Sequence, residues 1–217
     1  RAATALGEIR CQGQANIPHL VFEAFCVLLT DQYVIVHKAA ARALRRFNLP
    51  EDLIPLAAQS VLNLLLYYRE KRDEDRFLVD CIDVLVGWIN VFGENADAIR
   101  RLLINCALKV KPSHFRNQFR FLSPWLGQCD AFADLALHML PHMDRHYHHG
   151  YESWRLLQQL SDTSVVARQD RFVELGIAML SEAPWLTYEI VERLSMAGAE
   201  EGARRLATAC ANQLPNT

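Results

Sequence analysis

The sequence predicts an all-α fold, a right-handed superhelix built from antiparallel helix pairs. Three observations predict it. Apolar residues recur at steps of three and four along most of the chain, which is the spacing of one helix face. No run alternates apolar and polar residues between Asn-Gly or Asp-Gly turns, as a half-buried strand in a hairpin would. Two consecutive segments also recur 37 and 38 positions further along, and a period of this size is typical of helical solenoids.

Composition and length agree with one large helical array. The chain has 217 residues, 51% of them apolar and 22% charged, and its net charge is −2. So many apolar residues can fill a continuous core, whereas a dedicated nucleic-acid binder would usually be strongly basic. We expect a single solenoid over residues 1–217, with its clearest repeats in 1–66 and degenerate repeats in 67–217.

The expected helices are separated by links of a few residues. Pro18 stands where a first-turn proline is tolerated, and Asp31 and Ser164 stand where helix N-caps are favoured. The first expected helix covers Arg1–Ile9. The others, in chain order, are 17–29, 31–44, 49–68, 75–89, 95–110, 113–127, 130–142, 151–160, 164–180, 184–196 and 200–214.

The repeating unit is a pair of helices of different composition. "RAATAL", from Arg1, matches "AAARAL", from Ala39, at an offset of 38, and both are rich in Ala. The Leu-rich helices that follow match at an offset of 37, which places Ile17-Pro18 on Ile54-Pro55. Small residues let helix axes approach closely, while Leu and Phe fill the space between successive pairs. We therefore expect Ala2, Ala5, Leu6 and Ile9 to pack onto the next pair.

The stretch "DQYVIVHKAAARAL" resembles the second helix of a HEAT repeat. That family pattern has an Asp, then Val-Arg, then A-A-x-x-A-L. His37 stands where the pattern has its Arg. The residues that fit are Asp31, Val36, Ala39, Ala40, Ala43 and Leu44. Because "RAATALGEI" matches only the later part of this helix, the resemblance implies that the chain is a piece of a longer solenoid.

The resemblance also implies a partner-binding surface. Lys38, Arg42 and Arg45 lie at i, i+4 and i+7 and therefore share one helix face. In HEAT proteins the second helices line the concave side of the superhelix. We therefore expect an exposed basic stripe of these three residues to meet an acidic segment. That segment belongs to another protein or to another domain of the same polypeptide, so the chain reads as a protein–protein interaction scaffold.

A second basic stretch leaves an alternative open. Lys109, Lys111, Arg116 and Arg120 are interleaved with Phe115, Phe119 and Phe121. Aromatic rings among basic residues can stack on nucleobases. The alternative function is a nucleic-acid-binding HEAT-like solenoid, including one that resembles the DNA glycosylases of this fold. The slightly acidic net charge makes it the less favoured of the two.

No catalytic pattern stands out, so we expect no enzyme activity. There is no Ser-His-Asp arrangement and no glycine-rich phosphate loop. His138, His142 and His146 recur at steps of four beside Asp144, with His148 and His149 following. Pro141 opposes a continuous helix there, so a solvated loop is favoured over a metal site, and we expect no metal and no cofactor.

The six cysteines are scattered singly, without a C-x-x-C pair. They are interpreted as buried thiols, which favours a reducing compartment and hence the cytoplasm. The longest apolar runs are too short to span a bilayer, so no membrane partner is expected.

Overall fold

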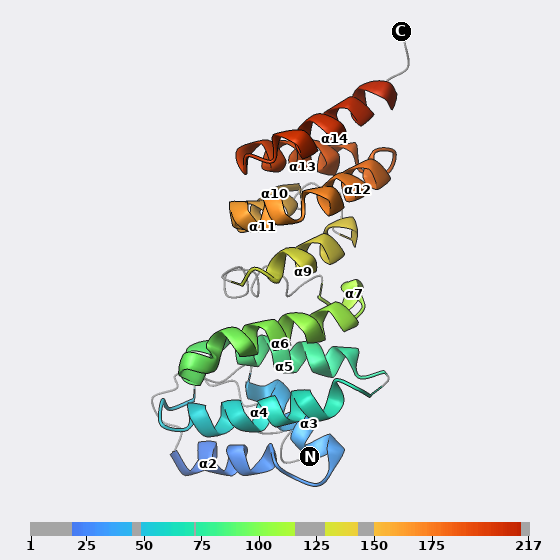
Figure 1. Ribbon diagram of the computed structural model, residues 1–217. Helices are drawn as coiled ribbons and strands as arrows, with labels where there is room; N and C mark the ends of the chain where they lie inside the picture. The colour runs from blue at the N-terminus through green and yellow to red at the C-terminus, as the bar shows by residue number, and fades with distance from the viewer. Residues whose placement is uncertain (1–18, 45–48, 72, 116–128, 143–149, 214–217) are drawn as a thin grey trace. The chain divides into compact units, whose positions relative to one another are not determined.

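A computed structural model describes residues 19–44, 49–71, 73–115, 129–142 and 150–213 (Figure 1). Every regular element in these ranges is a helix, which confirms the predicted all-α class. The contacts within the chain define two units, Arg1–His114 and Phe115–Thr217. Each unit is described on its own.

Unit 1 consists of helices that pack on their sequence neighbours and next neighbours. Its elements are α2 (His19–Leu28), α3 (Val34–Leu44), α4 (Ile54–Tyr68), α5 (Asp75–Gly87), the 3-10 helix η2 (Ile89–Asn95), α6 (Ala96–Lys109) and α7 (Pro112–Phe115). In Figure 1, α2, α4 and α6 lie one above another. Helix α3 contacts α2 and α5, and α5 also contacts α4 and α6.

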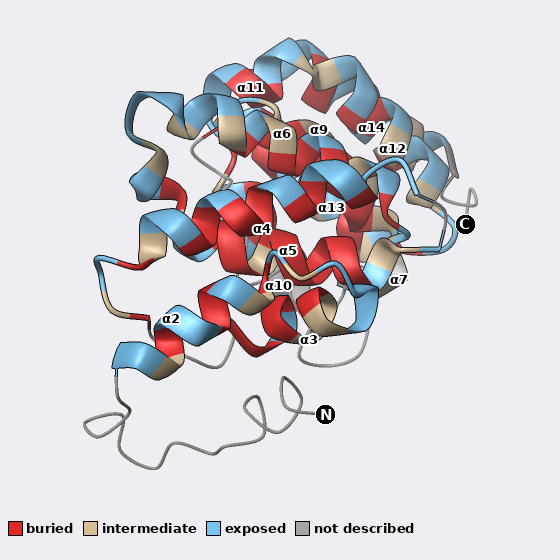
Figure 2. Cartoon of the chain, turned by 90° about the horizontal axis from the view of Figure 1, so that it is seen from below, coloured by how far each residue is buried: buried red, intermediate tan, exposed pale blue. Residues whose placement is uncertain are grey.

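The core of unit 1 reflects the two helix compositions seen in the sequence. Ala40 and Ala41 of α3 are fully buried, as the small side of a closely packed helix requires. The larger side chains that fill the core include Leu65, Tyr68 and Phe77, each at most 2% exposed. Figure 2 colours the ribbon by burial and shows buried residues on α4 and α5, alternating on α4 with exposed ones.

Unit 2 contains a closely packed group of three helices with shorter helices beside it. Its elements are α9 (Phe132–Met139), the 3-10 helix η3 (Leu140–His142), α10 (Gly150–Gln158), α11 (Asp162–Ala167), α12 (Gln169–Met179), α13 (Pro184–Met196) and α14 (Glu200–Gln213). Helices α12, α13 and α14 contact one another, and α10 packs on α13. Phe172, Leu194 and Leu206 lie in this core.

A glycine brings α12 and α14 together. A Cβ atom at Gly176 of α12 would lie 2.5 Å from Cδ2 of Leu206, a fully buried residue of α14. The Gly176 carbonyl also accepts a hydrogen bond of 2.9 Å from Oγ1 of Thr187 in α13. One residue without a side chain therefore serves as the contact point of three helices.

The expected single helix over 164–180 is wrong, because the structure divides it at Arg168. Ser161 has an extended backbone (φ −67°, ψ 147°), and its side chain accepts a hydrogen bond from the Ser164 N–H. Ser161 is thus the N-cap of α11, and the expected cap Ser164 lies buried in its first turn. Arg168 leaves the helical conformation (φ −122°, ψ 17°), and its guanidinium binds both carboxylate oxygens of Asp134 at 2.9 Å. This paired contact holds the break.

Side-chain hydrogen bonds in both units join residues that are 31 to 39 positions apart. In unit 1 they include Lys38 to Glu74, Arg42 to Asp80 and Lys109 to Glu70. In unit 2 they include Arg168 to Asp134, Arg205 to Asp170 and Arg193 to Asp162. The separations are those of one helix pair to the next. The segment Arg1–Ile9, on which the sequence repeat begins, lies outside the described residues.

Among the described residues, Cys26, Cys81, Cys106 and Cys129 are buried and are not in disulfides, and Cys210, also outside any disulfide, is partly exposed. Burial raises the pKa of the Cys81 thiol well above its usual value, so this residue behaves as a small apolar group. Among the described residues, no helix combines the length and the apolar character needed to cross a bilayer.

Candidate functional site

The predicted basic stripe on α3 is only partly exposed. The Lys38 ammonium lies 2.5 Å from both carboxylate oxygens of Glu74, and its side chain is 17% exposed. It also lies 4.7 Å from the ring centre of Tyr68, a cation–π contact. The expectation of three solvent-exposed cations is therefore wrong at Lys38, because α5 begins beside it and supplies its partner. Arg45 lies outside the described residues.

His37, the residue before Lys38 in α3, has a structural role. Its Nδ1 lies 2.9 Å from the Asp31 carbonyl oxygen, and its Nε2 lies 2.8 Å from the hydroxyl of Tyr68. A carbonyl can only accept, so Nδ1 carries the proton and Nε2 accepts from the Tyr68 hydroxyl. Both side chains are buried, and together they join α3 to α4.

Arg42 is the member of the stripe that reaches solvent. Its Nε donates to Asp80 of α5 at 2.8 Å, and its side chain is 53% exposed. Its two terminal nitrogens form no hydrogen bond with any described residue. Arg42 therefore has unused donors at the surface where α3 meets α5.

Arg42 is one of the residues that line a cleft in unit 1 with a volume of about 490 Å³. Its walls come from α3, the link before α5, the first turn of α5, the end of α6 and α7. Almost all of its lining is charged. The basic side chains are Arg42, Arg76, Lys109, Lys111 and His114, and the acidic ones are Asp73, Glu74 and Asp75, with Phe77 the one apolar residue of the lining.

Several of these charges are already paired within the protein. Asp75 Oδ2 accepts the backbone N–H of Lys111 at 3.1 Å and lies 3.4 Å from Nδ1 of His114. Lys109 donates to Glu70 at 3.0 Å, which holds the pKa of that carboxyl below its usual range. The contacts of Asp75 join the start of α5 to the segment after α6, and the contact of Lys109 joins the end of α6 to the link after α4. The segments that line the cleft are therefore connected to one another by polar contacts.

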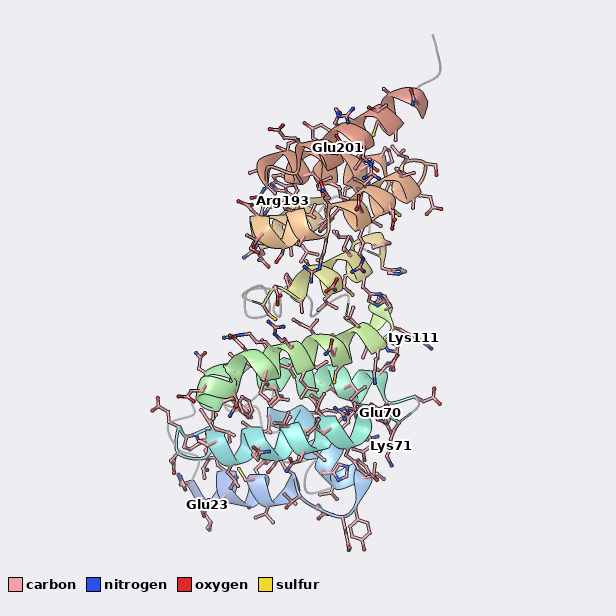
Figure 3. All side chains as sticks on the ribbon, in the orientation of Figure 1. Glu23, Glu70, Lys71, Lys111, Arg193 and Glu201 are labelled. Atoms are coloured by element: carbon pink, nitrogen blue, oxygen red, sulfur yellow. The ribbon has the colours of Figure 1, made fainter. Side chains whose placement is uncertain are left out.

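Other charges in the cleft have no partner in the described part of the chain. The side chains of Arg76 and Lys111 are exposed and form no ion pair there. Asp73 is also exposed and forms no ion pair there. It lies in the short link between α4 and α5, where its backbone has a positive φ of 63°. Figure 3 shows Lys111 at the same end of unit 1 as Glu70 and Lys71. The unpaired charge of the cleft is therefore mainly positive.

The sequence alone did not indicate this cleft. "REKRDEDR", from Arg69 to Arg76, mixes both signs and looks like an ordinary solvated turn. The sequence offset of 37 to 38 positions could have indicated which charges pair. Glu74 and Asp80 lie 36 and 38 positions after Lys38 and Arg42, the basic residues of α3 that bind them. Lys109 and Lys111 of the second basic stretch do line the cleft, whereas Arg116, Arg120 and Phe119 lie outside the described residues.

The histidine cluster is described only in part. His138 ends up near His142, with ring centres 6.4 Å apart, because α9 ends at Met139 and Pro141 lies in the 3-10 turn η3. Asp144, His146, His148 and His149 lie outside the described residues. Among the residues that the structure covers, no three potential ligands come close enough to hold a metal ion.

No family model matches this chain, and searches of curated proteins and of solved structures gave no significant match.

Proposed function

We propose that this chain is a protein–protein interaction scaffold of the HEAT-like kind, in which stacked helix pairs present a binding surface to another polypeptide. The observation that carries the proposal is the charged cleft of unit 1. Its walls come from three successive helix pairs, and it offers Arg42, Arg76 and Lys111 with donors that the chain itself leaves unused. Such a surface binds by ion pairs and hydrogen bonds.

The repeat architecture supports the proposal. Within each unit, side-chain hydrogen bonds join residues 31 to 39 positions apart, a separation close to the repeat period in the sequence. In a right-handed solenoid of antiparallel pairs, such contacts keep a long surface in a fixed shape. The single array over residues 1–217, expected from the sequence, is part of the same proposal.

The charge distribution favours a polypeptide partner over a nucleic acid. Asp73 is an exposed carboxylate in the lining of the cleft, and the chain carries a net charge of −2. A phosphate backbone would meet repulsion from this group, because its charges are closely and evenly spaced. A polypeptide can present carboxylates to the cations and amide N–H groups to the acids.

Selection of a displayed peptide library on the purified chain tests this function. We expect the recovered peptides to share a common pattern and to bind the chain in solution. Oligonucleotides, single- and double-stranded, are titrated at low and physiological salt in parallel. Binding of oligonucleotides alone, with a steep dependence on salt, would replace this proposal by the nucleic-acid alternative.

A further inference from the structure

We infer that the cleft of unit 1 binds an acidic peptide segment, and that Arg42, Arg76 and Lys111 hold its carboxylates. The inference rests on the proposed scaffold function and names the chemistry of the partner. Of the α3 stripe it keeps Arg42 and leaves out Lys38, which is bound by Glu74, and it adds Arg76 and Lys111.

The first argument is the balance of unpaired charge. Glu74 is neutralised by Lys38, and Asp75 accepts the Lys111 N–H beside His114. Three lining residues keep positive groups without a partner in the described chain: the exposed side chains of Arg76 and Lys111 and the terminal nitrogens of Arg42. The one unpaired carboxylate of the lining is that of Asp73. A ligand that brings negative charge is therefore favoured, and a basic one is not.

The second argument is the geometry of the donors. Arg42 donates to Asp80 only through Nε, so its two terminal nitrogens remain as a coplanar pair of hydrogen-bond donors. A guanidinium of this kind binds a carboxylate with two parallel hydrogen bonds. The orientation of the Arg42 side chain is fixed by the Asp80 contact, so little side-chain freedom is lost when a ligand binds.

The third argument is the direction of α5, whose first turn also lines the cleft. Its N-cap residue Glu74 forms no side-chain hydrogen bond to the helix, because its carboxylate binds Lys38 instead. The first N–H groups of a helix carry partial positive charge and attract anions. This field adds to that of Arg76 at the same end of the cleft.

A peptide suits the cleft better than a free phosphate or a nucleic acid. The cations are contributed by α3, by the start of α5 and by the link between α6 and α7, so they mark out an extended site. Asp73 lies exposed in the same lining and would repel a continuous row of phosphates, but it can accept an amide N–H from a peptide.

The test measures binding of a fluorescein-labelled peptide in which Glu alternates with Gly and Ser. Its neutral Gln version and inorganic phosphate serve as the competing probes. We expect the Glu peptide to bind more tightly than the Gln peptide, and salt to weaken this binding. The double variant Arg76→Ala and Lys111→Ala should lower the affinity about tenfold, since each exposed contact contributes roughly a factor of three.

The matched control is Arg155→Ala, which removes an exposed cation of α10 outside the cleft. It should change the affinity less than about twofold. Circular dichroism checks that each variant is folded. Equal affinity for the Glu and Gln peptides, no binding of the Glu peptide, equal competition by phosphate, or an unchanged affinity in the double variant would each overturn the inference. If library peptides of another chemistry still bind, the scaffold function stands without it.

Discussion

The Tyr68 hydroxyl donates a hydrogen bond of 2.8 Å to Nε2 of His37, and both side chains are more than nine-tenths buried. The other ring nitrogen of His37 donates to the carbonyl of Asp31, in the link before α3. His37 thus uses both nitrogens within the protein. Its side chain links α3 to α4 and to the segment that precedes α3.

Removal of one partner of this bond should destabilise unit 1. His37→Ala leaves the Tyr68 hydroxyl buried without an acceptor, at a cost of about 2 to 3 kcal/mol in the free energy of unfolding. Tyr68→Phe should cost about 1 to 2 kcal/mol for the same reason. Urea denaturation of the variants measures both values.

The control for this prediction is Tyr67→Phe. Tyr67 is 57% exposed, and its hydroxyl accepts from Lys71 at the surface. Its replacement should change the free energy of unfolding by less than about 0.5 kcal/mol. The double variant of His37 and Tyr68 should lose less than the sum of the single losses. Strict additivity would mean that the two side chains act independently.

Arg193 lies in α13 and donates hydrogen bonds to groups at the end of α10 and the start of α11. It is 4% exposed and donates to the Leu157 carbonyl at 2.9 Å, to the Leu160 carbonyl at 2.5 Å and to Asp162 at 2.8 Å. Arg193→Ala should destabilise unit 2 by about 2 to 4 kcal/mol, because two carbonyls at a helix end lose their donor. Arg193→Lys should restore little, since one ammonium cannot reach the same three acceptors.

The comparison variant for Arg193 is Arg204→Ala. Arg204 is a mostly exposed residue of α14 that pairs with Glu201 one turn away. Its loss should shift the unfolding midpoint hardly at all, because exposed ion pairs contribute under about 1 kcal/mol. Similar losses for the two variants in thermal or chemical denaturation would argue against the capping role of Arg193.

Unit 2 should be more stable at about pH 5 than at about pH 7 through one residue. Burial raises the pKa of the Glu189 carboxyl to about 6, and the nearby Glu192 acts in the same direction, although Ser153 donates to it at 2.6 Å. A carboxyl with a raised pKa in the folded state stabilises the fold while it is protonated. That contribution is complete below the usual pKa and is lost as the pH rises through about 6.

Glu189→Gln should remove this dependence and leave unit 2 at least as stable at neutral pH. The effect stays below about 1 kcal/mol, because the carboxyl is partly exposed and solvent screens it. Chemical denaturation of both proteins across this pH range gives the difference. A steeper loss of stability toward high pH in the variant than in the parent would contradict the assignment.

Gly176→Ala should destabilise unit 2 although alanine is the better helix former. The added methyl would lie 2.5 Å from Leu206, which is fully buried and cannot move aside freely. Overpacking of this kind costs about 1 to 3 kcal/mol, against a gain of about 1 kcal/mol in helix propensity. In contrast, Gly87→Ala in α5 meets no atom within 4 Å, so it should be neutral or slightly stabilising. Melting temperatures of the two variants decide the point.

The sequence by itself determined the all-α class and most of the helix positions. Apolar spacing is a local property, so α4, α5, α13 and α14 lie close to the ranges that it predicts. The division of 164–180 at Arg168 was not predictable in this way, since both halves keep a helical pattern. It depends on Asp134, which binds the Arg168 guanidinium from a distant helix.

Only the tertiary structure decided which charged side chains form ion pairs and which remain exposed to solvent. Lys38 and Arg42 share one helix face by spacing alone, yet Lys38 is bound by Glu74 while Arg42 keeps its terminal nitrogens exposed. Sequence spacing places a residue on a helix face, but the neighbouring helix determines whether that face meets solvent or a carboxylate. The cleft joins α3 to residues 73–77 and 109–114. These segments are far apart in the sequence, and the packing of α5 against both α3 and α6 brings them together.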